Sequence, residues 1–283
     1  MREADCRTRK ERGRLTELQH WFQYDFMRNA FLAILIITPL FGIMGTMIVN
    51  NKMAFFSDAL GHSALTGIAV GVVLGMTNTN LSMILFAIVF ALLLNWISSR
   101  SAASTDTIIS VFSSASLAIG LAILSKGGNF SKYSSLLVGD ILSITPREIV
   151  LLLLLFVATL IFWSLCLNHL LAISVHRTLA KSRHIHVALL QNLFAIFVAL
   201  VVMLSIRWVG MLIINALLIL PAAASRNIAS NMREYHLFSI VFSVFSGILG
   251  LFISYYTNVA TGPMIVIFAA ILYFATYLYG KKM

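Results

Sequence analysis

The chain has 283 residues, of which 60% are hydrophobic and only 11% are charged, and its mean hydropathy is +0.94. Soluble domains carry about a quarter charged residues, so this composition excludes a water-facing globular surface. The formal net charge is +10, but the basic residues lie mostly at the ends of apolar segments, where Lys and Arg sit beside lipid headgroups. We therefore expect a lipid bilayer around the chain and no binding to nucleic acid.

Residues 1–26 form a polar, basic N-terminal tail that differs from the rest of the chain. They hold six of the twenty basic residues and five of the ten acidic residues. The tail has neither the apolar run nor the small-residue cleavage site of a cleavable signal peptide. We therefore predict one transmembrane domain over residues 27–283 and leave the tail out of the fold prediction.

Nine apolar stretches follow in chain order, each near the roughly 20 residues that cross a bilayer as a helix. Backbone N–H and C=O groups in hydrocarbon must be satisfied within the segment, which favours helices. The expected spans are 28–49, 54–76, 81–98, 107–124, 147–167, 187–206, 209–224, 236–256 and 262–280. The count falls to eight if Arg207 and Trp208 lie inside one bent helix.

The segment 133–142 is apolar but too short to cross, so we expect it to be re-entrant and buried in protein. The predicted fold class is therefore an all-α polytopic membrane protein with eight or nine transmembrane helices plus a short re-entrant segment.

Basic residues in short loops predict the orientation of such a protein. They gather in the loops 168–186 and 225–235 and at the C-terminus, whereas the loops 77–80 and 257–261 contain no Lys or Arg. We therefore expect the first group on the cytoplasmic side. Nine spans then place the basic tail outside, so either the tail is not native to the protein or the count is wrong by one helix.

The second span contains one acid and one imidazole, Asp58 and His62. Asp58 is the only carboxylate inside an apolar span, and His62 lies one helical turn further along the same face. A carboxylate oxygen and an imidazole nitrogen can share a divalent ion, and ionisable groups in hydrocarbon usually mark a transport path. Three interpretations stay open: a helix cap with a core histidine, a proton relay, and a path for a metal ion.

Two absent motifs narrow the function. The chain has no Gly-x-x-x-x-Gly-Lys-Ser/Thr loop for nucleotide phosphates and no His-Glu-x-x-His helix of a metalloprotease. It also lacks the second intramembrane carboxylate that we expect in a proton-driven exchanger. We therefore predict a transport subunit rather than an enzyme, powered by a separate ATPase chain. A proton-coupled secondary metal transporter is the alternative.

Four motifs occur in order along the chain: Phe55-Phe56-Ser57-Asp58-Ala59-Leu60-Gly61-His62-Ser63, Leu137-Val138-Gly139-Asp140-Ile141-Leu142, Leu218-Ile219-Leu220-Pro221-Ala222-Ala223-Ala224-Ser225-Arg226, and Thr261-Gly262-Pro263. In order and spacing they resemble the permease subunits of zinc, manganese and iron ABC importers, over roughly residues 27–280.

This resemblance implies a multi-pass permease of the bacterial plasma membrane. Its implied partners are cytoplasmic ATP-binding subunits, an extracytoplasmic metal-binding lipoprotein and a second permease subunit, either identical or different. It also implies that Asp58 and His62 line the metal path. Zn²⁺ or Mn²⁺, or Fe²⁺, is then the transported substrate, and no cofactor is permanently bound.

The loop after the fifth span resembles the short helix that docks into the ATPase in this family. The expected ATPase-coupling residues are His176, Arg177, Thr178, Leu179, Ala180, Lys181 and His184. Family members usually have Asp, Glu and Gly where this chain has His176, Thr178 and His184. The loop is therefore more basic here than in its relatives.

Overall fold

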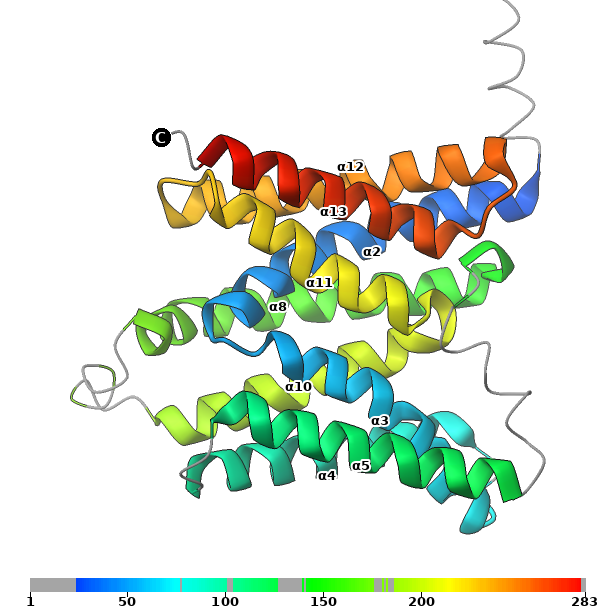
Figure 1. Ribbon diagram of the computed structural model, residues 1–283, viewed down its shortest axis with the longest axis vertical. Helices are drawn as coiled ribbons and strands as arrows, with labels where there is room; N and C mark the ends of the chain where they lie inside the picture. Colours follow the sequence, from blue (N-terminus) through cyan, green and yellow to red (C-terminus); the bar gives the residue numbers. More distant parts are fainter. Residues whose placement is uncertain are drawn as a thin grey trace, which may run out of the picture.

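A computed structural model describes residues 24–76, 78–100, 104–126, 139, 141–175, 180, 182 and 186–280. This part of the chain contains nine α-helices and one short 3-10 turn, and no strand (Figure 1). The helices are α2 (Asp25–Asn50), α3 (Ala54–Val73), α4 (Thr79–Arg100), α5 (Thr105–Lys126), α8 (Pro146–Val175), α10 (Val187–Val209), α11 (Met211–Arg226), α12 (Met232–Thr257) and α13 (Thr261–Gly280), with the turn η1 at Ile141–Ser143. The all-α prediction is confirmed.

Each of the nine expected spans corresponds to one of these helices. Eight of the described helices are long and apolar enough to cross a membrane, judged by length and composition. The exception is α11, whose 16 residues extend about 24 Å at a rise of about 1.5 Å per residue. The hydrocarbon core of a bilayer is about 30 Å thick, so α11 is the short member of the bundle.

The break predicted near Arg207 and Trp208 lies at Gly210. Helix α10 ends at Val209 and α11 begins at Met211, and Gly210 between them has φ +85°, a conformation that glycine adopts without steric cost. Figure 1 shows α10 and α11 as the two arms of a V that run in opposite directions. The alternative of a single bent helix is therefore wrong.

The described chain starts and finishes at opposite ends of the bundle. In Figure 1, α2 begins on the right, where α12 ends, and α13 ends on the left. The left-hand junctions α2–α3, α4–α5 and α11–α12 carry Lys52, Arg100, Arg226 and Arg233, and the opposite ends of α2, α5, α8 and α10 carry Arg28, Lys126, Arg147 and Arg207. Nine helices are described and eight of them are long and apolar enough to cross a membrane, so the number of passes and the orientation stay predictions. Residues 1–23 of the basic tail lie outside the described part.

Helix α2 is held in the middle of the bundle by small residues and hydroxyl groups. Ser239 and Ser243 on α12 donate hydrogen bonds of 2.7 Å to the backbone oxygens of Gly42 and Thr38 on α2. A Cβ on Gly45 would lie 2.1 Å from the backbone oxygen of Leu218 on α11. Such close backbone contacts are the usual means of joining helices in lipid. Helices α2 and α3 are accordingly the most buried spans and α8 the most exposed.

Only part of the expected re-entrant segment 133–142 is described. Gly139 has φ +76°, and Ile141 and Leu142 begin η1. A Cβ on Gly139 would lie 2.1 Å from the backbone oxygen of Val209, so this end of the segment packs on the α10–α11 junction. The other residues of the segment, including Asp140, lie outside the described part, and the re-entrant course stays a prediction.

Candidate metal-binding site

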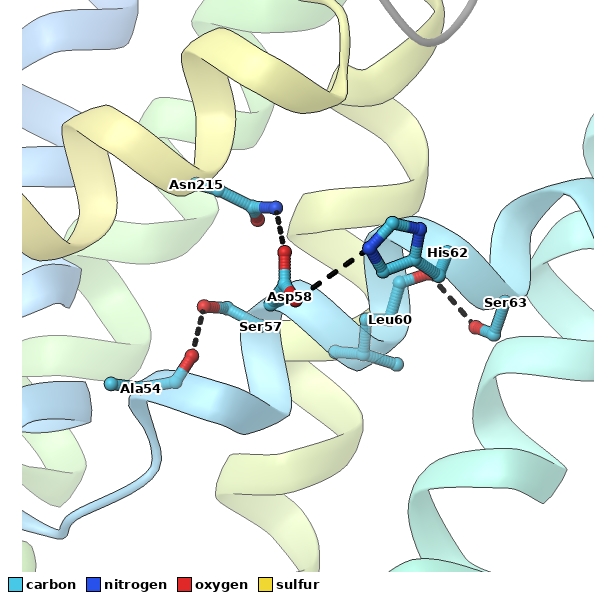
Figure 2. A network of polar contacts seen from close by, with 7 residues as sticks. All are labelled: Ala54, Ser57, Asp58, Leu60, His62, Ser63 and Asn215. Atoms are coloured by element: carbon cyan, nitrogen blue, oxygen red, sulfur yellow. Dashed lines mark hydrogen bonds and ion pairs between the residues drawn. The ribbon is translucent and has the colours of Figure 1, made fainter. Parts of the chain in front are cut away.

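Asp58 and His62 lie one turn apart near the start of α3, with their polar atoms turned toward each other (Figure 2). The Oδ2 atom of Asp58 is 3.6 Å from Nε2 of His62, which is longer than an N–H···O hydrogen bond. The two side chains remain 46% and 27% exposed, respectively. The two side chains are therefore accessible and are not hydrogen-bonded to each other.

The separation of the two atoms suits a shared ion. A divalent transition metal binds carboxylate oxygen and imidazole nitrogen at about 2.1 Å each, so two ligands at a tetrahedral angle lie about 3.4 Å apart. The observed Oδ2–Nε2 distance of 3.6 Å is close to that value. An ion could therefore bind between Asp58 and His62 with little movement of either side chain.

The interpretation of Asp58 as a helix cap and of His62 as a core histidine does not match the geometry. The N-cap of α3 is Met53, and it has no side-chain hydrogen bond. Asp58 is the fifth residue of the helix, so it lies beyond the capping position. The Nδ1 atom of His62 is buried and has no hydrogen-bond partner among the described residues, whereas an ordinary core histidine would be satisfied.

Asn215 on α11 completes the polar cluster, and it was not among the predicted site residues. Its Nδ2 atom donates a hydrogen bond of 2.7 Å to Oδ1 of Asp58 (Figure 2). The Oδ1 atom of Asn215 is buried and has no hydrogen-bond partner in the described part. An asparagine inside the apolar run Met211–Leu220 was the available signal, because amides in hydrocarbon are rare and usually functional.

The contact between α3 and α11 depends on Gly61, which lies between Asp58 and His62. A Cβ on Gly61 would be 2.5 Å from Cγ of Met211 and 3.6 Å from Nδ2 of Asn215. The missing side chain lets the two helices approach closely. Gly61 therefore allows Asn215, 157 residues away in sequence, to reach the carboxylate of Asp58.

The acid–imidazole pair faces a cavity of about 230 Å³ between α3 and α5. Its walls are Phe55, Asp58 and His62 from α3 and Ile109, Ser110, Ser113, Ser114 and Leu117 from α5. This volume is well above the share of one water molecule, about 30 Å³ in the liquid. Three serine hydroxyls opposite the acid and the imidazole make a polar space that suits a partly hydrated ion.

One chain supplies an incomplete set of strong metal ligands. Within the described residues, no group of three or more His, Cys, Asp and Glu side chains could hold a metal ion. Zinc in a stable site takes four ligands. Asp58 and His62 alone therefore suit transient binding, and further ligands must be water, hydroxyl or amide oxygens, or groups of another chain.

Of the seven expected ATPase-coupling residues, only Ala180 lies in the described part. It is buried and packs with Ile173 and Val187 in a small apolar cluster at the end where α8 finishes and α10 begins. The other six, His176, Arg177, Thr178, Leu179, Lys181 and His184, lie outside the described residues. Their role in coupling stays a prediction.

Comparison with known protein families gives one match that spans all the described helices. The model of the ABC 3 transport family matches residues 23–280. The chain belongs to the ABC 3 transport family. The predicted resemblance to a multi-pass permease of ABC transporters is thereby confirmed, and so is the expectation of a transport component rather than an enzyme. Such a permease works with ATPase and substrate-binding partners.

Individual ABC 3 proteins match nearly the full length of the chain. It is 30% identical over 255 residues to the high-affinity zinc uptake system membrane protein ZnuB of Haemophilus influenzae, covering 88% of this chain and 96% of that protein. It is 28% identical to the manganese import system permease protein ScaB of Streptococcus parasanguinis, with 92% of each chain covered. Relatives of this chain thus include proteins named for zinc and for manganese.

Two solved structures have a similar fold. PsaBC from Streptococcus pneumoniae in complex with Fab contains a chain that superimposes with a TM-score of 0.81 at 27% identity, covering 93% of this chain and 95% of that one. A putative metal-chelate type ABC transporter in an inward-facing conformation superimposes with a TM-score of 0.66 at 16% identity. The second likeness concerns the fold alone.

Proposed function

We propose that this chain is the membrane-spanning permease subunit of an ATP-driven importer of divalent transition metal ions, either zinc or manganese with iron as an alternative, and that Asp58 and His62 bind the ion in transit. The observation that carries the proposal is the 3.6 Å separation of Asp58 Oδ2 and His62 Nε2 beside the cavity between α3 and α5. The names of the zinc and manganese relatives support this substrate class.

The chemistry of the acid–imidazole pair suits passage better than storage. The carboxylate of Asp58 attracts the cation, and the imidazole of His62 adds a nitrogen ligand that hydrated Na⁺ or Mg²⁺ does not favour. Two ligands from one chain bind weakly, so the ion can leave when the path opens to the other side. Release is as important as binding in a transport path.

The missing ligands come from a second permease subunit in this proposal. Two copies, or two related chains, that face one another across a central path provide two acids and two imidazoles, which is up to four ligands. An extracytoplasmic metal-binding lipoprotein delivers the ion, and the loop with Arg177 and Lys181 docks into the cytoplasmic ATPases. ATP hydrolysis on those chains supplies the energy.

Uptake into proteoliposomes tests the energy source. The permease is reconstituted with its ATPase and its metal-binding protein, and accumulation of radioactive Zn²⁺ or Mn²⁺ is measured with and without ATP. We expect uptake that needs ATP and persists when an ionophore collapses the proton gradient. Uptake that continues without ATP and stops with the ionophore would instead support the proton-coupled alternative.

The same uptake assay tests the acid–imidazole pair. Asp58→Ala and His62→Ala each remove one ligand and should abolish ATP-dependent uptake while the complex still assembles. His169→Ala is the matched control, because His169 is an exposed imidazole on α8 that does not line the cavity. Normal uptake by both Asp58→Ala and His62→Ala would refute their role as ligands.

A further inference from the structure

Asn215 has one half of its carboxamide bonded and the other half buried without a partner. Its Nδ2 donates to Oδ1 of Asp58 at 2.7 Å, which leaves Oδ2 as the carboxylate oxygen that faces His62. Its Oδ1 is buried and has no hydrogen-bond partner among the described residues. An unsatisfied carbonyl oxygen in a buried place is costly, so the carboxamide of Asn215 carries an acceptor group that no described residue uses.

We infer that Asn215 has two roles in the ion path: it donates a hydrogen bond that positions Asp58 in the empty site, and its side-chain oxygen becomes a third protein ligand when a divalent ion binds. The inference rests on the proposed function, because it concerns the ion held by Asp58 and His62. A rotation of the carboxamide about its last torsion exchanges the oxygen and the nitrogen with almost no change in shape.

The charge on the ligands decides which way the carboxamide points. An ionised carboxylate accepts hydrogen bonds only, so the empty site holds the NH₂ group toward Asp58. A divalent cation on Asp58 repels the NH₂ group and attracts the carbonyl oxygen. The ion itself therefore drives the exchange, and its departure restores the hydrogen bond. This reversible change fits a site that must bind and then release.

A third ligand from Asn215 changes the preference of the site among metals. Asp58 and His62 alone provide one oxygen and one nitrogen, whereas Asn215 adds a second oxygen. Carboxylate and carbonyl oxygens suit Mn²⁺, and imidazole suits Zn²⁺. Asn215 is therefore expected to favour Mn²⁺ over Zn²⁺, beyond any selection by the delivery protein.

Metal titrations of the purified full-length permease test this role. Dissociation constants for Mn²⁺ and Zn²⁺ are measured separately in wild type, Asn215→Ala and Asn215→Asp, and Co²⁺ absorption spectra report the coordination geometry. We expect Asn215→Ala to weaken Mn²⁺ binding roughly 10- to 100-fold, as removal of a supporting group at a metal site does, and to weaken Zn²⁺ binding much less. The Co²⁺ spectrum should change with it.

The variant Asn215→Asp distinguishes a role of residue 215 as a metal ligand from a role that only positions Asp58. It keeps an oxygen at the same place but cannot donate a hydrogen bond to an ionised Asp58. The ligand role predicts that Asn215→Asp binds Mn²⁺ at least as tightly as wild type. The inference is overturned if Asn215→Ala weakens Mn²⁺ and Zn²⁺ binding equally, Asn215→Asp does not restore it, and the Co²⁺ spectrum is unchanged. It is also overturned if Asn215→Ala binds Mn²⁺ as tightly as wild type.

Two controls make the result specific. Asn95→Ala removes another amide of the bundle, which donates to Asn192 Oδ1 on α10, and it should leave the ratio of Mn²⁺ to Zn²⁺ affinity unchanged. Asp58→Ala in the same titration distinguishes the two proposals. Loss of binding in Asp58→Ala with no effect of Asn215→Ala refutes only the role of Asn215, whereas unchanged binding in Asp58→Ala refutes the proposed site itself.

Discussion

Thr66 on α3 and Ser116 on α5 are joined by two hydrogen bonds. The hydroxyl of Thr66 donates to the backbone oxygen of Ser116, and the hydroxyl of Ser116 donates to Oγ1 of Thr66 at 3.0 Å. One turn further along α5, a Cβ on Gly120 would lie 2.8 Å from the backbone nitrogen of Thr66. These contacts hold α5 against the helix that carries Asp58 and His62, and they fix the width of the cavity between α3 and α5.

Replacing Gly120 by Val should push α5 away from α3, because the new side chain meets backbone that cannot move aside. Overpacking of this kind costs about 1–3 kcal/mol, so thermal unfolding of the purified permease in detergent should occur at a lower temperature. Metal uptake should fall as well. Ala122→Val is the matched control on an exposed position of the same helix. Equal stability of the two variants would show that the close approach at Gly120 is unimportant.

Thr66→Val keeps the shape of the side chain but removes the hydroxyl that donates to the backbone oxygen of Ser116 and accepts from its hydroxyl. A buried polar group that loses its partner costs about 1–3 kcal/mol. We expect a matching loss of stability in chemical or thermal unfolding. Thr159→Val on α8 is the control, since its hydroxyl bonds only to Leu155 in its own helix. The prediction fails if Thr159→Val is as harmful as Thr66→Val.

Gly139 and Gly75 both have positive φ, +76° and +68° respectively, but only Gly139 is crowded. Alanine at either position in this left-handed region costs about 1–2 kcal/mol. At Gly139 the added Cβ also meets the backbone oxygen of Val209 at 2.1 Å, whereas nothing lies within 4 Å of a Cβ on Gly75. Gly139→Ala should therefore lower the unfolding temperature more than Gly75→Ala, as differential scanning calorimetry can measure.

His62→Asp should change the metal preference of the proposed site rather than remove transport. The substitution replaces an imidazole by a second carboxylate, and a set of oxygen ligands favours Mn²⁺ over Zn²⁺. We expect the ratio of Mn²⁺ to Zn²⁺ affinity to rise about tenfold, which corresponds to ~1.4 kcal/mol. Competition between the two ions during uptake measures this ratio. An unchanged ratio would mean that His62 does not touch the ion.

The position of the site on α3 could be predicted because its signal is local. Asp58 and His62 are four residues apart, so helical geometry alone places them on one face. Asn215 carried only a weak signal, a single amide in an apolar run. Its partner lies 157 residues away, and no periodic pattern in either helix indicates which helices meet. The cavity wall on α5 was missed for the same reason.

The amino-acid sequence by itself determined the class of this protein, its helices and their order. Each helix satisfies its own backbone hydrogen bonds within one apolar segment, so length and composition suffice to predict it. Only the tertiary structure decided that α10 and α11 are two separate helices, that α5 packs on α3 beside Asp58, and that Asn215 bonds to the carboxylate. These features depend on close contacts between helices at Gly61 and Gly120 and on the positive φ of Gly210. In lipid such contacts are set by packing and hydrogen bonds between distant segments. The acid–imidazole pair was therefore predictable from the sequence, and its surroundings were not.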